Sequence, residues 1–415
     1  MRDGMTTAPT IRGDSDRRRR AGRPRWRWLR RMIGALTVVV LLFVAVYAWA
    51  WASVDRSSIA RAMWWREADV GDRYRFPART IPAGDDASLL RHGADVDLDP
   101  ATPATEAGIG TFDDFLEATG TLAFVVVHDD RLVDERYFAG ADRQSLQTSF
   151  SVAKSFVSTL IGIAIDEGLI DSVTDPVTDY LPELAERDQR FTQITLRDLL
   201  TMSSGLHYEE QSLPLPWGDD VNTYYGTDLR DLALTATEIE QEPGQTWLYN
   251  NYNPLLLGLV LERATGMSVS QYMSTRLWQP MGAEFDATWS LDSEASGFEK
   301  MESGLNAAPV DFARFGELFL HHGAWGGTRI VPGDWVGSAT AEDTTTDPAP
   351  RYGYFWWIDL ERPGRFYALG NLGQYIYVAP DADTVIVRNG SDWGVPNATW
   401  VATLRRVADL TKGAA

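Results

Sequence analysis

An apolar run near the start of the chain constrains its fold more than any other feature. Met32–Ala52 is 21 residues long and contains no charged side chain. A helix of that length, at ~1.5 Å per residue, can cross the apolar core of a bilayer. Positive charge stays on the cytoplasmic side of a membrane, so we expect a cytoplasmic N-terminus, with the rest of the chain outside. The arginines that stand just before the run are Arg17–Arg20, Arg23, Arg25, Arg27, Arg30 and Arg31.

A cleaved signal peptide is the alternative interpretation of this segment. Ala50-Trp51-Ala52 loosely resembles the small-x-small pattern of a cleavage site. Signal peptides have apolar regions of about 7–15 residues, and this run is longer, so we favour an uncleaved anchor. Cleavage would instead release the body of the protein in secreted form.

The charge of the chain is distributed unevenly. The formal net charge is −20, yet residues 1–31 hold eleven Arg against three Asp, which leaves the remainder strongly acidic. An acidic body repels the phosphate backbone, so nucleic-acid binding is disfavoured. The basic arm is explained by a membrane surface next to the apolar run.

Cysteine and lysine usage narrow the possible chemistry. The chain has no Cys, which excludes disulfides, thiolate catalysis and Cys-ligated metals. Its three lysines are Lys154, Lys300 and Lys412, whereas arginine accounts for the other basic residues. Arg cannot release its proton in a protein but a desolvated Lys can, so a Lys within an apolar stretch is a candidate base. Lys154 lies in such a stretch.

Four segments follow from composition. We expect a basic cytoplasmic arm over residues 1–31, an anchor over 32–52, a lead-in over 53–105 and one compact domain over 106–412. The strand-like runs and helices of that domain predict an α+β (α/β) fold, in which an antiparallel sheet is covered by helices and joined to a helical subdomain. The expected strands are 121–128 and 131–138, which form a hairpin, and 352–359, 365–369, 374–379 and 384–388; the expected helices are 150–168, 255–263 and 398–410, within a helix-rich middle over 170–290.

Ser151-Val152-Ala153-Lys154 is the first candidate for catalysis. Residues three apart lie on nearly the same helical face, so the Lys154 amine can reach the Ser151 hydroxyl. An apolar helix removes water from the ammonium and favours the neutral amine, which could then deprotonate Ser151. A Ser three residues before one of the three Lys would often arise by chance, so the spacing alone is weak evidence. The apolar surroundings of Lys154 are what favour a catalytic role, because burying an unpaired Lys is costly.

Two further segments carry candidate groups. In Tyr249-Asn250-Asn251, the Tyr249 phenol could pass a proton to a leaving group, and the Asn251 amide could fix Lys154 or the substrate. In the Gly-bracketed turn 370–374, Gly373 could let a substrate approach the backbone, and the Gln374 N–H could join the Ser151 N–H as an oxyanion hole. Taken alone, each could equally be an ordinary polar turn.

The order and spacing of these segments resemble the penicillin-recognising serine hydrolases. Ser-x-x-Lys, Tyr-x-Asn 98 residues later and a Gly-rich strand entry are similar to the class C β-lactamase-related group, most of all its 6-aminohexanoate-dimer hydrolase branch. Further matching stretches are Asp175–Val177, Tyr180–Pro182, Leu199–Leu206, Asn250–Glu262, Asp311–Gly316 and Tyr352–Trp357, so that the resemblance covers about 106–410, with a further stretch at Trp64–Arg79.

The resemblance implies a β-lactamase/transpeptidase-like fold and acyl-enzyme chemistry without metal or cofactor. It assigns Ser151 as nucleophile, Lys154 and Tyr249 as acid–base pair and Asn251 as a positioning group. Where many relatives carry His or Lys in the third motif, this chain has Asn371, which removes a cation that could hold a substrate carboxylate. The implied substrate is therefore a small amide or ester, with β-lactam or D-alanyl-peptide specificity in doubt.

Other classes fit less well. The five His form no His-Glu-x-x-His pattern, Gly-x-Ser-x-Gly is absent, and His321-His322 before Gly323 indicates an ordinary helix end. Tyr224-Tyr225 before Gly226 is either a pair of solvated loop aromatics or a substrate-facing lid that includes Tyr225. A non-catalytic cell-envelope binding protein that keeps the fold remains the alternative from another class, as do an esterase and a D-amino peptidase within the same one.

Overall fold

The computed structural model describes residues 24–85, 89–94, 96, 98, 110–210, 217–343, 349 and 351–413. The chain divides into two compact units, Met1–Ser53 and Val54–Ala415. In the first unit, the apolar run lies within helix α1 (Pro24–Ser53), of which Trp26–Ser53 is long and apolar enough to cross a membrane. The remainder of the basic arm, residues 1–23, lies outside the described residues, as do residues 99–109 of the lead-in and domain start.

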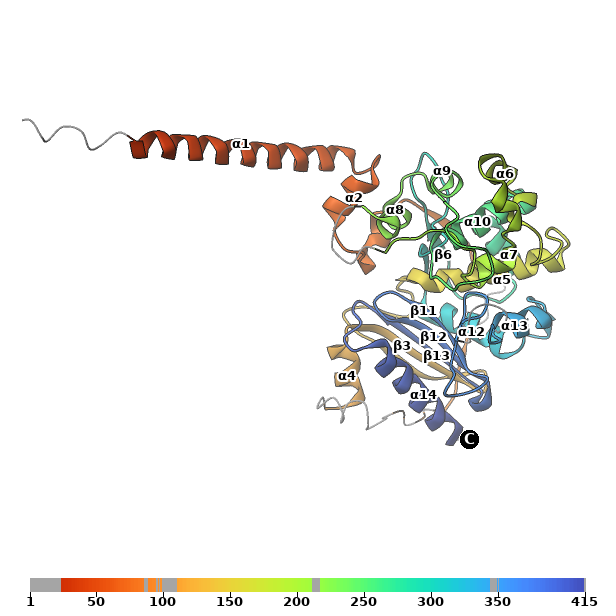
Figure 1. Cartoon of the computed structure of the whole chain (residues 1–415). Coiled ribbons are helices and arrows are strands. Elements are labelled where there is room, and N and C mark those ends of the chain that lie inside the picture. Colours follow the sequence, from red (N-terminus) through yellow and green to blue (C-terminus); the bar gives the residue numbers. More distant parts are fainter. Residues whose placement is uncertain are drawn as a thin grey trace, which may run out of the picture. The chain divides into compact units, whose positions relative to one another are not determined.

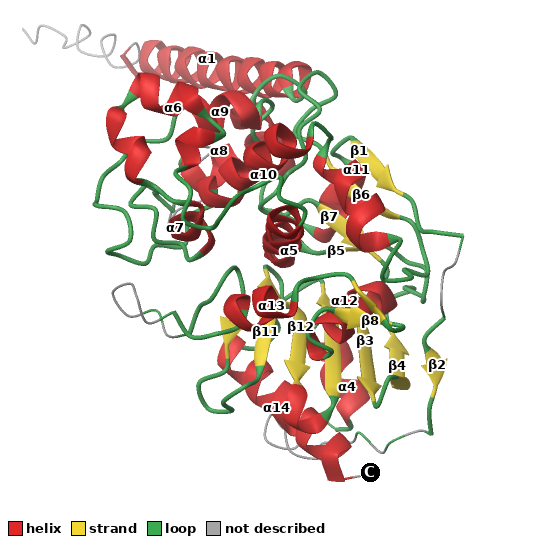
Figure 2. Ribbon diagram, turned by 90° about the vertical axis from the view of Figure 1, so that its right-hand side faces the viewer, coloured by secondary structure: helices red, strands yellow, loops and turns green. Residues whose placement is uncertain are grey.

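The second unit is built on a seven-stranded sheet with the order β10-β11-β12-β13-β3-β4-β2 (Figure 2). Neighbouring strands are antiparallel except for β2, which pairs in parallel with β4 at the edge. The strands are β2 (Arg91–His92), β3 (Thr121–His128), β4 (Arg131–Tyr137), β10 (Trp357–Ile358), β11 (Phe366–Gly370), β12 (Gln374–Ala379) and β13 (Thr384–Gly390).

Both faces of this sheet are buried, because successive side chains of a strand point to opposite sides. In β3, Phe124 and Val126 pack in one apolar cluster, whereas Val125 and Val127 pack in another. Helices α4 (Phe112–Ala118) and α14 (Asn397–Gly413) cover the first face, and α12 (Pro309–Leu320) covers the second (Figure 1). Near-continuous apolar strands such as TLAFVVVH follow from this double burial.

A mostly helical subdomain lies beyond α12. Helix α5 (Ala153–Asp166) runs between it and the sheet layer, where it packs against α10 (Tyr252–Thr265) and α13 (Gly333–Ala339) (Figures 1 and 2). The other segments of the subdomain are α6 (Pro182–Arg187), α7 (Leu196–Leu200), α8 (Asp219–Tyr225), α9 (Leu229–Thr235), α11 (Val269–Met273), the short turns η3 (Val177–Asp179) and η4 (Gln189–Gln193), and the π-helical turn η5 (Ser274–Trp278).

A second, four-stranded sheet has the order β1-β6-β7-β5. Its strands are β1 (Ala78–Ile81), β5 (Gln147–Thr148), β6 (Ala287–Ser290) and β7 (Leu305–Ala307). The first strand comes from the region that the sequence presents as a lead-in, and it is preceded by α2 (Ser58–Trp65) and the turn η1 (Val70–Tyr74). Residues 54–81 therefore belong to the same compact unit as the rest of the body. The remaining short segments are η2 (Phe150–Val152), β8 (Ala324–Trp325), β9 (Thr328–Arg329) and η6 (Pro380–Ala382).

The expected fold class is confirmed, with local corrections. The β3–β4 hairpin, strand β12, the helix after Ser151 and the C-terminal helix lie where the sequence predicts them. The strand expected over residues 352–359 is wrong for most of its length, because only Trp357–Ile358 pairs with β11 while Phe355 adopts a φ of +62° that breaks the extended path. The second sheet was not anticipated, since its strands have two to four residues and no visible alternation.

Candidate active site

Ser151 lies at the junction between η2 and α5. The preceding residue, Phe150, has a φ of +43°, a conformation that costs a non-glycine residue ~1–2 kcal/mol. The Ser149 N–H donates to the carbonyl of Leu305 in β7, and the Val152 N–H donates back to Ser149. Among the described residues no backbone carbonyl accepts the Ser151 N–H, so this amide is available to a bound group.

Lys154 is held at hydrogen-bonding distance from Ser151. Its Nζ lies 2.8 Å from Ser151 Oγ and 2.8 Å from the carbonyl oxygen of Glu302, and the lysine is only 1% exposed. It also faces the ring of Tyr249, whose centroid is 5.0 Å away. The Ser-x-x-Lys spacing thus produces the contact that the sequence predicted, and the Glu302 carbonyl is a second partner that orients the amine.

Tyr249 belongs to an aromatic cluster. Its ring stacks on Trp357 at a centroid distance of 6.2 Å and lies edge-on to Tyr352 at 6.4 Å, while Trp247 contacts all three rings. Burial raises the pKa of Tyr352 well above its usual value, with Tyr249 as a lesser cause, so the Tyr352 phenol stays protonated. The cluster fixes the Tyr249 ring, over which Lys154 Nζ lies.

The Asn251 side chain is bonded to residues outside the three motifs. Its Nδ2 donates to Tyr208 Oη at 2.8 Å and to Thr223 Oγ1 at 3.4 Å, and no hydrogen bond joins it to Lys154 among the described residues. Its Oδ1 is buried with no hydrogen-bond partner there. Contact with a substrate therefore stays a prediction for Asn251.

The third motif is arranged differently from the expectation. Gly373 has a φ of +77°, and a Cβ at this position would lie 2.1 Å from Nη1 of Arg388. That buried guanidinium donates to the carbonyls of Leu372 and Gly373, and burial lowers the Arg388 pKa to about 9. The position of Arg388 thus requires a glycine at residue 373, and no contact with a substrate is needed to explain it.

Gln374 likewise serves the turn. Its side chain is buried, with Nε2 donating to the carbonyls of Asn371 and Gly390, and its Cα pairs with Gly370 in the β11–β12 ladder. By contrast, the end of β11 touches the nucleophile segment, since a Cβ on Gly370 would lie 2.3 Å from the Ser149 carbonyl. The next amide, that of Asn371, donates to no backbone carbonyl among the described residues and is the better candidate for a second oxyanion donor.

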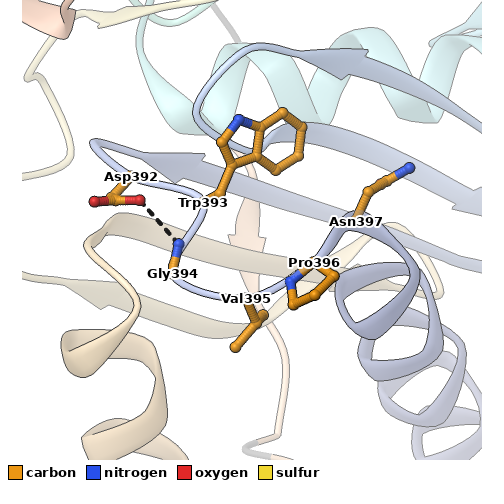
Figure 3. Close-up of a pocket in the computed structure, with 6 residues that line it drawn as sticks. All are labelled: Asp392, Trp393, Gly394, Val395, Pro396 and Asn397. Atoms are coloured by element: carbon orange, nitrogen blue, oxygen red, sulfur yellow. Dashed lines mark hydrogen bonds between the residues drawn. The ribbon is translucent and has the colours of Figure 1, made fainter.

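Asn371 also borders a surface depression. The loop between β13 and α14 lines a cavity of about 570 Å³ with residues Asp392, Trp393, Gly394, Val395, Pro396 and Asn397 (Figure 3). The Trp393 Nε1 donates to Asn371 Oδ1 at 3.2 Å, and the Gly394 N–H donates to Asp392 at 3.0 Å. This loop was not identified from the sequence, which offers no motif there.

Tyr224 and Tyr225 end helix α8 rather than occupying a solvated loop. Tyr225 is buried, and its hydroxyl donates to the carbonyl of Arg66. Tyr224 stacks on Phe150 at 6.3 Å and donates its hydroxyl to Asp72. The interpretation as solvated aromatics is wrong, and Tyr224, not Tyr225, is the residue that contacts the nucleophile segment.

Among the described residues, one group of three side chains could hold a metal ion. Asp130, Glu317 and His321 place their ligand atoms within 4.8 Å of one another. They come from the β3–β4 turn and the end of α12, elements that carry none of the three motifs. The candidate active site itself is built from Ser, Lys, Tyr and backbone amides.

This fold and this arrangement of groups agree with a known family. The family model described as beta-lactamase matches residues 110–404, and the chain belongs to that family. Within it, the chain is 30% identical over 333 residues to the 6-aminohexanoate-dimer hydrolase of Paenarthrobacter ureafaciens, over 72% of this chain and 81% of that relative. A solved Bacillus anthracis structure assigned as a 6-aminohexanoate-dimer hydrolase superposes with a TM-score of 0.70 at 25% identity, over 81% of this chain and 90% of that one. Esterase EstB of Burkholderia gladioli is 30% identical over 141 residues, which is 32% of this chain and 36% of that relative.

Proposed function

We propose that this protein is a serine hydrolase that cleaves a small amide or ester through an acyl-enzyme on Ser151. The observation that carries the proposal is the 2.8 Å contact between Nζ of the buried Lys154 and Oγ of the half-buried Ser151. The named relatives are hydrolases of amides and esters, which supports the general reaction.

The proposed reaction begins with proton transfer. Neutral Lys154 accepts the Ser151 proton as Oγ attacks the substrate carbonyl carbon, and the carbonyl oxygen becomes an oxyanion. The Ser151 and Asn371 amides donate to that oxyanion. Tyr249, next to Lys154, delivers a proton to the leaving amine or alcohol as the C–N or C–O bond breaks. Water then attacks the acyl group by the reverse sequence, which releases the acid and restores Ser151.

The surroundings favour a substrate without a carboxylate next to the scissile bond. Asn371 stands where many relatives have a cation, and the exposed Asp392 lies on the loop bonded to it. The half-buried rings of Trp247, Tyr249 and Trp357, packed on the buried Tyr352, offer an apolar surface for an aliphatic chain. We therefore propose short acyl esters and aminohexanoate-type amides as the first substrates to test.

We also propose that α1 anchors the hydrolase to a membrane, with its arginine-rich side in the cytoplasm. Its length, its apolar composition and the charge that precedes it support this orientation. A cleaved signal peptide would place the same domain outside the cell without the anchor.

Covalent labelling tests the nucleophile. A fluorophosphonate probe should modify the wild-type protein at a single serine, identified by mass spectrometry in the peptide that contains Ser151. Ser151→Ala should abolish both the label and the hydrolysis of an activated ester. The matched control is Ser155→Ala, one turn further along α5, whose hydroxyl donates to the carbonyl of Phe355; it should still be labelled. A label on another serine contradicts the assignment, and a folded wild-type protein that takes no label favours a non-catalytic binding protein.

A further inference from the structure

A second lysine is buried behind the candidate catalytic lysine. The Nζ of Lys300 lies 2.7 Å from Glu302 Oε1, and these two side chains are only 1% and 2% exposed. Burial lowers the pKa of Lys300 from its ordinary value, and Glu302 beside it acts in the opposite direction. An ion pair removed from water in this way is weak evidence for stability, since apolar side chains of similar volume often serve as well. Its presence calls for another role.

The pair is joined to the active site by one backbone group. The carbonyl of Glu302 is the second acceptor of Lys154 Nζ, at 2.8 Å, the first being Ser151 Oγ at 2.8 Å. Glu302 therefore bonds to one lysine through its side chain and to the other through its main chain. Whatever fixes the Glu302 side chain also fixes the carbonyl that orients Lys154.

The turn that carries Glu302 is tightly built. The Gly304 N–H donates to the Lys300 carbonyl at 2.7 Å, and the Trp289 Nε1 donates to the same carbonyl at 2.9 Å. The Ser303 hydroxyl donates to Glu302 Oε1, so this oxygen accepts from both Ser303 and Lys300. A Cβ on Gly304 would lie 2.8 Å from Lys300 atoms, which leaves little space for the turn to shift.

The Lys300 ammonium sits in a compartment that suits lysine rather than arginine. It lies 4.5 Å from the Tyr224 ring centroid and 4.7 Å from that of Phe76, and it donates to the Tyr224 carbonyl. A compact ammonium fits between two ring faces and two oxygens, whereas a planar guanidinium needs a wider, flatter space. This chain has Arg at 35 of its 38 basic positions, and two of its three lysines meet at Glu302.

The compartment is closed by the segment that follows α1. Phe76 comes after η1, and Asp72 within η1 accepts from the Tyr224 hydroxyl at 2.9 Å. Arg61 of α2 donates to the carbonyls of Gly226 and Asp292, next to the same groups. Tyr224 in turn stacks on Phe150, the residue before the nucleophile.

We propose that Lys300 and Glu302 are a positioning pair for Lys154, which holds the Glu302 carbonyl where it directs the Lys154 amine at Ser151. The proposal rests on the function proposed above. Neither side chain is assigned a contact with substrate, so the pair should govern the rate of the chemical step and leave substrate binding largely unchanged.

The test replaces both charges together. Lys300→Met/Glu302→Gln keeps the side-chain volumes and leaves no unpaired buried charge, so the protein should fold with a melting temperature close to that of wild type. We expect kcat for an activated ester, and the single-turnover rate of acylation, to fall about 10-fold or more, with KM changed less than about threefold. The control is Arg230→Met/Glu262→Gln, which removes a partly buried pair between α9 and α10 and should keep wild-type kinetics.

A second variant covers failure of the first to fold. Glu302→Asp keeps the charge but shortens the side chain, which draws the turn and its carbonyl away from Lys154, and kcat should again fall more than KM changes. A folded variant of either kind with wild-type kcat would overturn the inference. If wild type is not labelled at Ser151, the proposed function fails; if wild type is labelled and the variants acylate at the same rate, only the positioning role fails.

Discussion

At Lys154, a short contact with Ser151 allows two different roles. The amine could accept the Ser151 proton, or an ammonium could stabilise negative charge on the nucleophile and remain charged. The distance between the two atoms does not distinguish these roles, because the same nitrogen and oxygen form the hydrogen bond in each case. A side chain that keeps the charge but cannot act as a base separates them.

Lys154→Arg is therefore the informative substitution. If Lys154 is the base, kcat should fall by about 10²-fold or more, which is the scale for loss of a general base. Activity should be measured together with a thermal melt and fluorophosphonate labelling. These controls are needed because the larger guanidinium must fit against Glu302 and Tyr249 and could disturb the fold. A folded Lys154→Arg variant with near-normal turnover would show that charge suffices, and Tyr249 would then be the group to activate Ser151.

The residues of the site differ in how far sequence could reveal them. Ser151 and Lys154 are three positions apart on one helix, so local geometry brings them together whatever the rest of the fold does. The Glu302 carbonyl could not be predicted, since a backbone acceptor has no residue type and lies 148 positions from Lys154. The sequence could not show why residue 373 is a glycine, because a glycine in a turn does not reveal which neighbour requires it. In the structure that neighbour is the Arg388 guanidinium.

Among the elements, the end of α12 and the β3–β4 turn form a unit that depends on pH. His321 lies 2.5 Å from Asp130 and 3.6 Å from Glu317, whose carboxylate is fully buried. Burial raises the pKa of Glu317 to about 7, and Glu317 and Asp130 raise the pKa of His321 to about 9, against burial of its ring. Both groups hold protons more tightly in the folded state than in the unfolded state.

The stability of the fold should accordingly decrease as pH rises. The stability that the raised pKa of Glu317 contributes is lost as pH rises from its ordinary pKa of 4.5 to about 7. The stability that His321 contributes is fully present below pH 6.5 and is lost as pH rises to about 9. Glu317→Gln should therefore show a smaller decrease in melting temperature between pH 4.5 and 7 than wild type. Asp311 shifts in the same direction, so the measurement is the difference from wild type, with the exposed Glu294→Gln as control. Parallel curves for Glu317→Gln and wild type would contradict this account.

The large elements were predictable, and the small ones were not. Strands β3, β12 and β13 are buried on both faces and show continuous apolar runs, and α5 and α14, with 14 and 17 residues, are long enough to be recognised as helices. Strands β1, β5 and β7 have two to four residues, so their existence depends on partners distant in sequence. Tertiary pairing, and not local preference, creates them.

For the molecule as a whole, residues 54–81, which follow α1 and end in strand β1, determine how far the chain can be shortened from its N-terminus. Strand β1 pairs with β6 along its full length, and Phe76 and Asp72 close the compartment around Lys300. We expect removal of residues 1–53 to give a soluble protein with wild-type kcat. Removal of residues 1–82 should abolish ester hydrolysis and lower the melting temperature, because β6 loses a neighbour and Lys300 is opened to water.

The shorter protein is the control for the longer deletion, and both can be compared by activity and thermal melting. An active protein that lacks residues 1–82 would show that the segment is dispensable. If the full-length sequence is expressed and the protein is recovered from outside the cell in soluble form, with its N-terminus near Ser53, α1 is a signal peptide instead of an anchor.

The scarcity of lysine gives the folded protein an unusual chemical surface. Lys154 and Lys300 are sealed in the interior, while Lys412 in the last turn of α14 keeps 57% of its side chain exposed beside Asp381. Apart from the α-amino group, the folded body thus presents a single accessible amine. Within the body, dyes, polymers or solid supports coupled through amines would attach at that one helix end, without modifying the groups proposed for catalysis.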